Sequence, residues 1–342
     1  MVAAGLRACR LGSPISRQAE TPAATHRPAT LTAAFAALLL ALALSASAAP
    51  VVARALLLDA ARAGPAIVAV GEHATIVLSG DSGRTWESAA VAPGLTATLT
   101  GVAFAADAQR GWAVGHDALV LATTDGGRTW ARQWQGHSLE ASFLDVCALD
   151  AQHVIAIGAY GLYLATADGG RTWTPRRILD DDMHLNRITR GPTGTLYLAG
   201  ERGTLLRSRD AGDTWERIDS PYDGSFYGIL PLGAHDLIAY GLRGRVFRST
   251  NDGDAWEPVA LDRPMLITTA VAMEGPAPSG PSSLPAIVLA GQARALFRSD
   301  DGGRTFAPWP HGLESAVAEL LVAPDGTLLA FGEDGVTRLE HP

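Results

Sequence analysis

Six copies of one short pattern, 41 to 50 residues apart, constrain the fold of this 342-residue chain more than any other feature. Each copy begins with Ser or Thr, carries Asp or Asn two residues later and glycine four residues later, and closes on an aromatic residue. The copies are SGDSGRTW (79–86), TTDGGRTW (123–130), TADGGRTW (166–173), SRDAGDTW (208–215), STNDGDAW (249–256) and SDDGGRTF (299–306). We refer to them as the boxes. Repetition with a period of about 20 to 50 residues is typical of solenoids, propellers and other arrays.

A second mark accompanies every box. A glycine that ends an apolar run precedes the box glycine by 12 residues in all six units. A seventh unit, 328–340, has the first glycine and stops before the second. The run-ending glycines are Gly71, Gly115, Gly158, Gly200, Gly241, Gly291 and Gly332, and the box glycines are Gly83, Gly127, Gly170, Gly212, Gly253 and Gly303. The constant spacing indicates seven copies of one structural unit.

Within one unit the sequence resolves into four short strands. In the second unit, runs of apolar and β-branched residues begin at Thr100, Gly111, Leu119 and Thr129, and each is bounded by Gly, Asp or Asn. Four-stranded units of about 40 to 50 residues, repeated four to eight times, are typical of a β-propeller. We therefore expect an all-β fold, a seven-bladed β-propeller of antiparallel blades whose last blade has only three strands.

The repeat also predicts where each blade begins and ends. The expected blades are 54–94, 99–136, 142–178, 185–218, 225–260, 266–310 and 316–340. The insertion GPAPSGPSSLP (275–285) accounts for the 50-residue spacing as a loop between the first two strands of blade six. No N-terminal segment remains that is long enough to supply a fourth strand to blade seven, so the closure of the ring is the open question of this architecture.

The first 48 residues have the features of a secretory signal peptide. Residues 1–30 carry four arginines and one acid, and an uncharged run follows at 31–49. The apolar centre of that run, 31–44, has 14 residues, fewer than the about 20 that a membrane-spanning helix needs. Ala46, Ser47 and Ala48 supply a small-x-small cleavage pattern. We expect cleavage near Ala48, a single propeller domain over 49–342, and a periplasmic or secreted product. An uncleaved leader that anchors the protein to a membrane is the alternative.

Charge and cysteine content argue against several classes of protein. The chain has 27 basic residues, all arginine, and 35 acidic ones; removal of 1–48 leaves 23 and 34, a net charge of about -11. This balance argues against a nucleic-acid partner, which requires a basic face. Cys9 and Cys147 are too few for a disulfide framework or a zinc site. Cys147 is expected to be a small buried side chain. We expect no cofactor and a monomer.

The boxes lie between the third and fourth strands, where a hairpin turn needs glycine with positive φ and a carboxylate that accepts backbone N–H bonds. We expect the closing Trp to bury its ring against the blade while its indole N–H finds an acceptor. The pattern resembles the Asp-box, also called the bacterial neuraminidase repeat. The resemblance leaves one alternative function open, a glycan-binding propeller or a sialidase-like glycoside hydrolase. The F/Y-R-I-P segment of sialidases does not occur in the sequence, and glycosidases also need a pair of acid groups.

A second resemblance covers about 54–340. The segments GWAVGHDALVLATTDGGRTW (111–130) and AIGAYGLYLATADGGRTW (156–173), with their four weaker copies, resemble the photosystem II stability and assembly factors of chloroplasts and cyanobacteria and their relatives in non-photosynthetic bacteria. The resemblance implies a non-enzymatic, seven-bladed propeller that helps to assemble a membrane protein complex from the lumenal or periplasmic side. Similar bacterial proteins look like companions of exporters of the resistance-nodulation-division (RND) type. The implied partner is therefore a membrane protein or envelope complex, either such a transporter or a photosystem-like client.

The face opposite the boxes is where we expect the partner to bind. In a four-stranded blade, the turns between strands two and three lie on one face with the blade-to-blade loops, and propellers more often bind ligands on that face. We refer to it as the candidate face. Its polar and aromatic residues come from those turns, from the blade-to-blade loops and from the starts of the next strands. The candidate partner-binding residues are His73, His116, Asp117, Tyr160, His184, Asn186, Arg187, Arg202, Tyr222, Phe226, Tyr227 and Arg243.

Several of these residues have a purely structural alternative. Arg202 and Arg243 could pair with acids at the rim such as Glu201, and His184 and the tyrosines could serve packing. The run Asp180–Asp182 is typical of a solvated loop, and we expect no metal there because His184 is the only nearby nitrogen donor. The sequence contains no nucleophile elbow, P-loop, zincin helix or dinucleotide fingerprint, so we expect no enzymatic activity.

Overall fold

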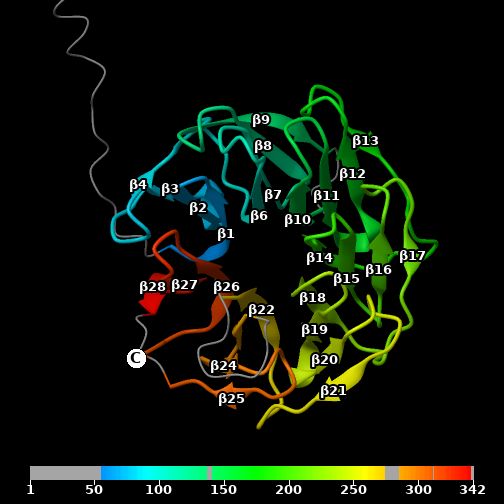
Figure 1. The fold of residues 1–342 in the computed structure, drawn as a ribbon. Helices are drawn as coiled ribbons and strands as arrows, with labels where there is room; N and C mark the ends of the chain where they lie inside the picture. The colour runs from blue at the N-terminus through cyan, green and yellow to red at the C-terminus, as the bar shows by residue number, and fades with distance from the viewer. Residues whose placement is uncertain (1–54, 137–140, 274–284, 311, 340–342) are drawn as a thin grey trace, which may run out of the picture. The chain divides into compact units, whose positions relative to one another are not determined.

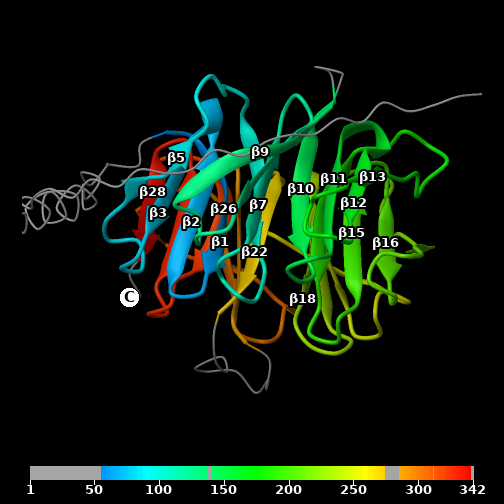
Figure 2. The same ribbon diagram turned by 90° about the horizontal axis from the view of Figure 1, so that it is seen from above.

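The computed structural model describes residues 55–136, 141–273, 285–310 and 312–339. Residues 48–342 form one compact unit. Within this unit seven sheets follow one another in a ring (Figure 1), and their strands run from one face of the ring to the other (Figure 2). We use the word channel for the centre of this ring, around which the first strand of each blade lies. The prediction of an all-β, seven-bladed propeller is confirmed. None of the described residues belongs to a helix that is long and apolar enough to cross a membrane.

Each blade presents its first strand to the channel and its later strands outward. The first strands are β1 (Leu57–Ala63), β6 (Leu99–Phe104), β10 (Phe143–Ala148), β14 (Leu185–Arg190), β18 (Phe226–Pro231), β22 (Ile267–Ala272) and β26 (Val317–Val322). The second strands are β2 (Ala66–Gly71), β7 (Gly111–Gly115), β11 (Val154–Gly158), β15 (Leu196–Gly200), β19 (Leu237–Gly241), β23 (Ile287–Gly291) and β27 (Leu328–Gly332).

The outer strands are shorter. The third strands are β3 (Ile76–Ser79), β8 (Leu119–Thr123), β12 (Tyr163–Thr166), β16 (Leu205–Ser208), β20 (Val246–Ser249), β24 (Leu296–Ser299) and β28 (Gly335–Leu339). The fourth strands are β4 (Glu87–Ser88), β9 (Thr129–Gln135), β13 (Thr174–Pro175), β17 (Glu216–Arg217), β21 (Glu257–Val259) and β25 (Ala307–Pro308). Blade seven has three strands, as predicted. Blade two has a fifth that was not predicted, β5 (Ala90–Val91), which pairs parallel with β9.

The hydrophobic core lies between neighbouring blades. Almost every residue of the second strands is buried, and the buried clusters combine side chains of adjacent blades, for example Val68 of β2 with Leu119 of β8. A single blade therefore cannot bury its faces alone, and the ring is the smallest unit that does so. The predicted insertion in blade six lies almost wholly outside the described residues. It falls between β22 and β23, the first two strands of that blade.

The run-ending glycines are required by the close approach of two backbones. Gly158 has an extended φ of -172°, so its conformation would suit any residue. A Cβ atom there, however, would lie 2.1 Å from the carbonyl oxygen of Ser142 and 2.7 Å from the Cα atom of Phe143. The next amide, of Ala159, donates to that same Ser142 oxygen at 2.9 Å. In the seven blades the corresponding Cβ-to-oxygen distances are 1.9 to 2.5 Å, so no side chain fits at this position.

The boxes close their turns through a carboxylate, as predicted, and also through a hydroxyl, which was not predicted. In blade three, the Thr166 hydroxyl accepts from the Gly170 amide at 2.9 Å and donates to Asp168 at 2.9 Å. Asp168 accepts from the amide and the hydroxyl of Thr172 at 2.9 and 2.7 Å, and Gly170 has a φ of 84°. These bonds lower the pKa of Asp168 to about 2. The stability that they contribute is present above about pH 4 and is lost as the pH falls through 2.

The indole N–H groups of the boxes find an acceptor in only some blades. Trp86 and Trp130 donate to the carbonyl oxygen of their box glycine at 3.2 and 2.8 Å, and Trp215 donates to a tyrosine hydroxyl at 3.4 Å. Within the described ranges, the indole nitrogens of Trp173 and Trp256 have no hydrogen-bond partner. The expectation of a partner is thus confirmed for three of these five tryptophans.

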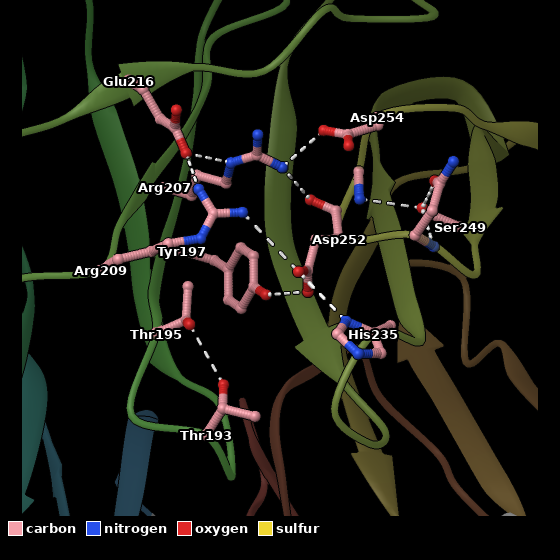
Figure 3. Close-up of polar contacts among 12 residues, drawn as sticks. Thr193, Thr195, Tyr197, Arg207, Arg209, Glu216, His235, Ser249, Asp252 and Asp254 are labelled. Atoms are coloured by element: carbon pink, nitrogen blue, oxygen red, sulfur yellow. Dashed lines mark hydrogen bonds and ion pairs between the residues drawn. The ribbon is translucent and has the colours of Figure 1, made fainter.

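Among the described residues, a side chain of one blade donates a hydrogen bond to the box of the next blade at five junctions. The donor is an Arg or Gln, and the acceptor is the carbonyl of the box glycine or of the residue before it. The pairs are Gln133 with Gly169, Arg176 with Gly212, Arg207 with Asp252, Arg248 with Gly302, and Arg338 with Ser82. At the junction of blades four and five (Figure 3), Arg207 also contacts Asp254 at 2.7 Å, and the Tyr197 hydroxyl donates to Asp252 at 3.0 Å.

The ring closes by packing between blades seven and one. Phe331 of β27 is fully buried and meets the Trp86 ring edge-on, with 6.0 Å between ring centroids. Leu57 and Ile67 belong to the same buried cluster. On the box side, the Arg84 guanidinium contacts Asp325 at 2.8 Å. Within the described residues, the first and last blades share no strand. The ring is therefore closed by contacts between their side chains.

Candidate functional site

The candidate face is one surface of paired loops. The turns between strands two and three donate backbone N–H bonds to the blade-to-blade loops beside them. These bonds run from Ala118 to Ala141 at 2.7 Å, from Gly161 to Met183 at 2.7 Å and from Gly203 to Gly224 at 2.8 Å. The turn and the loop of one blade therefore hold each other in place, and the prediction that they share a face is confirmed.

Five predicted residues occupy the same position at the crest of these turns. His73, Asp117, Tyr160, Arg202 and Arg243 each stand two residues after a run-ending glycine and have φ between 51° and 60°. Non-glycine residues rarely adopt this left-handed conformation, and where they do so repeatedly the position often has a role in function. All are exposed except Asp117, which is half-buried. His116, beside Asp117, is exposed as well.

Tyr160 and His184 come together on blades three and four. Tyr160 is 64% exposed and its ring meets the His184 imidazole edge-on, with 4.8 Å between centroids. The imidazole Nδ1 lies 3.3 Å from Glu201, which also accepts the His184 amide at 3.0 Å. Glu201 is thereby engaged by His184, so the alternative in which Arg202 pairs with its neighbour Glu201 is not found.

Three predicted residues serve the fold instead of the surface. Phe226 is fully buried at the start of β18, and its prediction as a partner contact is wrong. It is equivalent to Leu57 and Phe143, which begin the first strands of other blades, and that strand period was the signal that identified it as core. The Asn186 side chain donates to the Phe226 carbonyl at 2.7 Å and so ties blade four to blade five. Tyr227 is half-buried against the core between blades five and six.

Arg187 points into the channel instead of the loop surface. Its guanidinium lies 2.6 Å from Glu319 of blade seven. Six side chains meet there, and we refer to them as the channel cluster: Asp59, Asp145, Arg187, Tyr240, Thr269 and Glu319. All but Tyr240 stand at the second pairing position of a first strand, next to the register shift. A polar residue at this place in an otherwise apolar strand was the signal that sequence reasoning missed.

A pocket of about 450 Å³ opens on blade five. Arg243, Arg245 and Arg263 line it together with the apolar side chains of Phe247 and Leu261. Beside it, the Tyr222 ring stacks on Phe247 at 6.4 Å between centroids, and the Arg245 guanidinium lies 5.8 Å above the Tyr222 ring. Asp262 lines the pocket as well and lies 3.6 Å from Arg263, so the lining combines basic and apolar side chains with one carboxylate.

Charge is unevenly distributed over the candidate face. Three arginines, Arg202, Arg243 and Arg294, lie in the turns between strands two and three of blades four, five and six. All three are exposed, and none has an ion-pair partner in the described part of the chain. Glu333 and Asp334 occupy the corresponding turn of blade seven. A basic sector therefore extends over blades four to six, beside an acidic blade seven.

The described part of the chain contains neither a group of residues that could bind a metal ion nor a sialidase-like arginine triad at the channel. No group of three or more His, Cys, Asp or Glu there could hold a metal ion. Asp181 and Asp182 instead face Arg217 and Arg177, at 3.9 and 3.4 Å. The channel cluster has three carboxylates and one arginine, so the arginine triad that sialidases use does not converge at the channel.

The comparison with protein families matches this fold and this repeat. A family model described as "Photosynthesis system II assembly factor YCF48" matches residues 58–139 and 131–271. The chain belongs to this family. The matched residues include all twelve predicted partner-binding positions, from His73 to Arg243, and end in blade six. A comparison with curated proteins found no match to the sequence.

Solved structures of YCF48 share the fold. "YCF48 bound to D1 peptide" is 21% identical, with a TM-score of 0.67, over 86% of this chain and 94% of the other. YCF48 from Cyanidioschyzon merolae is 18% identical, with a TM-score of 0.67, over 86% and 97%. The WD40 propeller domain of Doa1 is 10% identical, with a TM-score of 0.64, over 83% and 92%. At these identities the structural likeness shows the propeller and not the client.

Proposed function

We propose that this YCF48-family protein is a non-enzymatic scaffold that binds an extended segment of a membrane protein and assists the assembly of its complex. One observation carries the proposal: the pocket of blade five is lined by Arg243 and Arg245, which are exposed and have no ion-pair partner in the described ranges, whereas Arg263 in the same lining lies 3.6 Å from Asp262. The signal peptide predicted at 1–48 supports action outside the cytoplasm, in the periplasm or an equivalent lumen.

The pocket suits a segment that alternates acidic and apolar residues. Guanidinium groups bind carboxylates through paired hydrogen bonds, and arginine is the residue best suited to that geometry. Arg243 and Arg245 supply such groups, Arg263 is paired with Asp262, and Phe247 and Leu261 add apolar side chains to the lining. The solved structure "YCF48 bound to D1 peptide" supports the use of a YCF48-like propeller as a peptide receptor.

The client is a membrane complex of the envelope. A photosystem-like complex is the client that membership of the YCF48 family suggests. An RND-type exporter is the second client that we propose, because the predicted leader would bring the propeller to the compartment into which the periplasmic domains of such exporters extend. In both cases the propeller would hold a segment of the client before the complex is complete.

Charge reversal in the pocket tests the proposal. We expect Arg243→Glu to weaken binding of a fluorescent peptide of alternating Glu and Leu by about tenfold or more, which corresponds to about 1.4 kcal/mol. Fluorescence anisotropy measures the affinity. The matched control is Arg171→Glu, the same charge change at an exposed box residue on the opposite face, which should leave the affinity unchanged. Equal weakening by both variants, or by neither, contradicts the proposed site.

The same preparation tests the alternative function. A panel of sialosides and polysaccharides should show neither turnover nor binding, because the channel cluster lacks the arginines of a sialidase. Hydrolysis of any of them by the wild-type protein, lost in Asp145→Asn, would identify a glycoside hydrolase instead of a scaffold.

A further inference from the structure

The channel cluster joins blades from opposite sides of the ring. Arg187 of β14, in blade four, reaches Glu319 of β26, in blade seven, at 2.6 Å. Thr269 of β22 donates its hydroxyl to the other carboxylate oxygen of Glu319 at 2.8 Å. Tyr240 of β19 reaches the channel beside Gly228, where a Cβ atom would lie 2.2 Å from the tyrosine oxygen. The glycine thus leaves the space that the phenol fills.

The two aspartates of the cluster also connect neighbouring blades. Asp59 of blade one accepts the backbone N–H of Val102 in blade two at 2.7 Å. Asp145 of blade three accepts the backbone N–H of Ile188 in blade four at 2.9 Å. Each carboxylate therefore bonds to the first strand of the following blade, and the state of these groups affects how firmly the inner strands are held together.

The cluster contains more acids than bases. Three carboxylates, Asp59, Asp145 and Glu319, are 7%, 9% and 6% exposed, and they face one guanidinium, that of Arg187, whose side chain is 24% exposed. Among the first strands packed against them, β6 and β18 contribute Gly101 and Gly228 at the equivalent positions and therefore no charge. Fully ionised, the cluster would bury two negative charges in excess.

The remaining titratable neighbours do not remove this excess. Tyr240 is a neutral phenol whose pKa burial raises further. Cys147, on β10, is half-buried rather than buried as predicted, and burial together with the Asp145 charge raises the pKa of its thiol to about 12. Arg190, near Cys147, instead donates to the Leu149 carbonyl at 2.8 Å. A buried carboxylate without a counter-charge takes up a proton in preference to remaining ionised.

The acidities of the two aspartates agree with this geometry. Burial, and then the charge of Glu319, raises the pKa of Asp59 well above its ordinary range. Burial raises the pKa of Asp145 to about 6 although the Arg187 guanidinium acts in the opposite direction. Both directions follow from enclosure of the carboxyl groups in the channel.

We propose that the channel cluster is a proton-binding site: in weakly acidic solution the folded ring holds a proton on Asp59 and on Asp145 that the unfolded chain releases, and acidification towards pH 5 stabilises the ring. The unfolded aspartates lose their protons near pH 4, whereas in the ring Asp145 keeps its proton up to about pH 6 and the pKa of Asp59 is raised well above its ordinary range. The folded state therefore binds more protons in this window. Its stability is highest at the acidic end and falls as the pH rises.

Unfolding of the mature chain between pH 5 and pH 8 tests the site. For each extra proton held by the ring, the unfolding constant should rise up to about tenfold for each unit of pH increase. Asp59→Asn keeps an oxygen for the Val102 amide but cannot titrate, so it should flatten this dependence, and Asp145→Asn should flatten it around pH 6. The control Asp168→Asn should change the unfolding constant by the same factor at every pH, because that carboxyl titrates near pH 2.

Infrared spectroscopy of the native protein gives a second test that does not depend on variant folding. The wild-type protein at about pH 5 should show the carbonyl stretch of protonated, buried carboxyl groups, and this band should decrease as the pH is raised through about 6, where Asp145 loses its proton. In a folded Asp59→Asn variant the band should be reduced. Absence of the band from the wild-type protein, or the same pH dependence of unfolding in wild type and both channel variants, overturns the proposal.

Discussion

Replacing Gly158 with alanine is expected to lower the free energy of unfolding by about 3 kcal/mol. The added Cβ atom would lie 2.1 Å from the Ser142 oxygen and 2.7 Å from the Phe143 Cα atom. Both are backbone atoms, so no side-chain rotation relieves the clash, and β11 must separate from β10. That separation also breaks the bond from the Ala159 amide to the Ser142 oxygen. Chemical denaturation followed by tryptophan fluorescence measures the loss.

A glycine outside this constraint gives the control. Gly80 is exposed, and a Cβ atom placed on it would meet no atom within 4 Å. We therefore expect Gly80→Ala to change the free energy of unfolding by less than about 0.5 kcal/mol. If Gly158→Ala is as well tolerated as Gly80→Ala, the close contact between the first and second strands is not what fixes glycine in every blade.

Replacing Phe331 with alanine is expected to cost about 3 to 5 kcal/mol of stability. Phe331 is fully buried where blade seven meets blade one, and it packs edge-on against Trp86. Truncation removes this contact and leaves a cavity at the junction that closes the ring. Since the described residues share no strand across that junction, the loss reports directly on how the ring closes.

Two further truncations serve as controls for the stability loss of Phe331→Ala. Phe297 is fully buried and belongs to the core between blades five and six, so Phe297→Ala makes the same chemical change at an interior junction. Leu242 is 36% exposed on the candidate face, and Leu242→Ala should have little effect. A full loss at Phe297 with only a small loss at Phe331 would show that blade seven is loosely attached and would contradict closure by packing.

Features that recur with the repeat could be predicted from the sequence. The two glycine marks and the box occur in successive units at nearly constant spacing, so blade number, strand order and the three-stranded last blade followed from pattern alone. The hydrogen bonds of Asp168 could be anticipated as well, because they join residues four positions apart or closer. Local chemistry determines such turns wherever the box occurs.

Features that depend on two distant residues could not be predicted. Arg187 and Glu319 are 132 residues apart and meet only because the ring is closed. Arg248 reaches Gly302 across a blade junction for the same reason. The burial of Phe226 was not predicted because this residue directly follows a polar loop and is the first residue of β18. β5 contains only two residues, too few for a periodic signal.

The two faces of the ring differ in a way that bears on function. The box face repeats nearly the same residues in six blades. On the candidate face the equivalent left-handed position holds His73, Asp117, Tyr160, Arg202 and Arg243 in successive blades. A rigid frame that repeats its structural contacts while it varies the side chains on one face is typical of a binding scaffold. This contrast supports the candidate face as the client surface.

Photo-crosslinking in intact cells that produce the protein tests this central claim most directly. A photoreactive amino acid replaces Tyr160, which is 64% exposed on the candidate face, and in a second strain it replaces Arg171, which is exposed on the box face. Mass spectrometry then identifies the captured proteins. Our account predicts that position 160 captures a membrane protein of the envelope and that position 171 does not. Capture of no membrane protein at position 160, or of the same proteins at both positions, would contradict it.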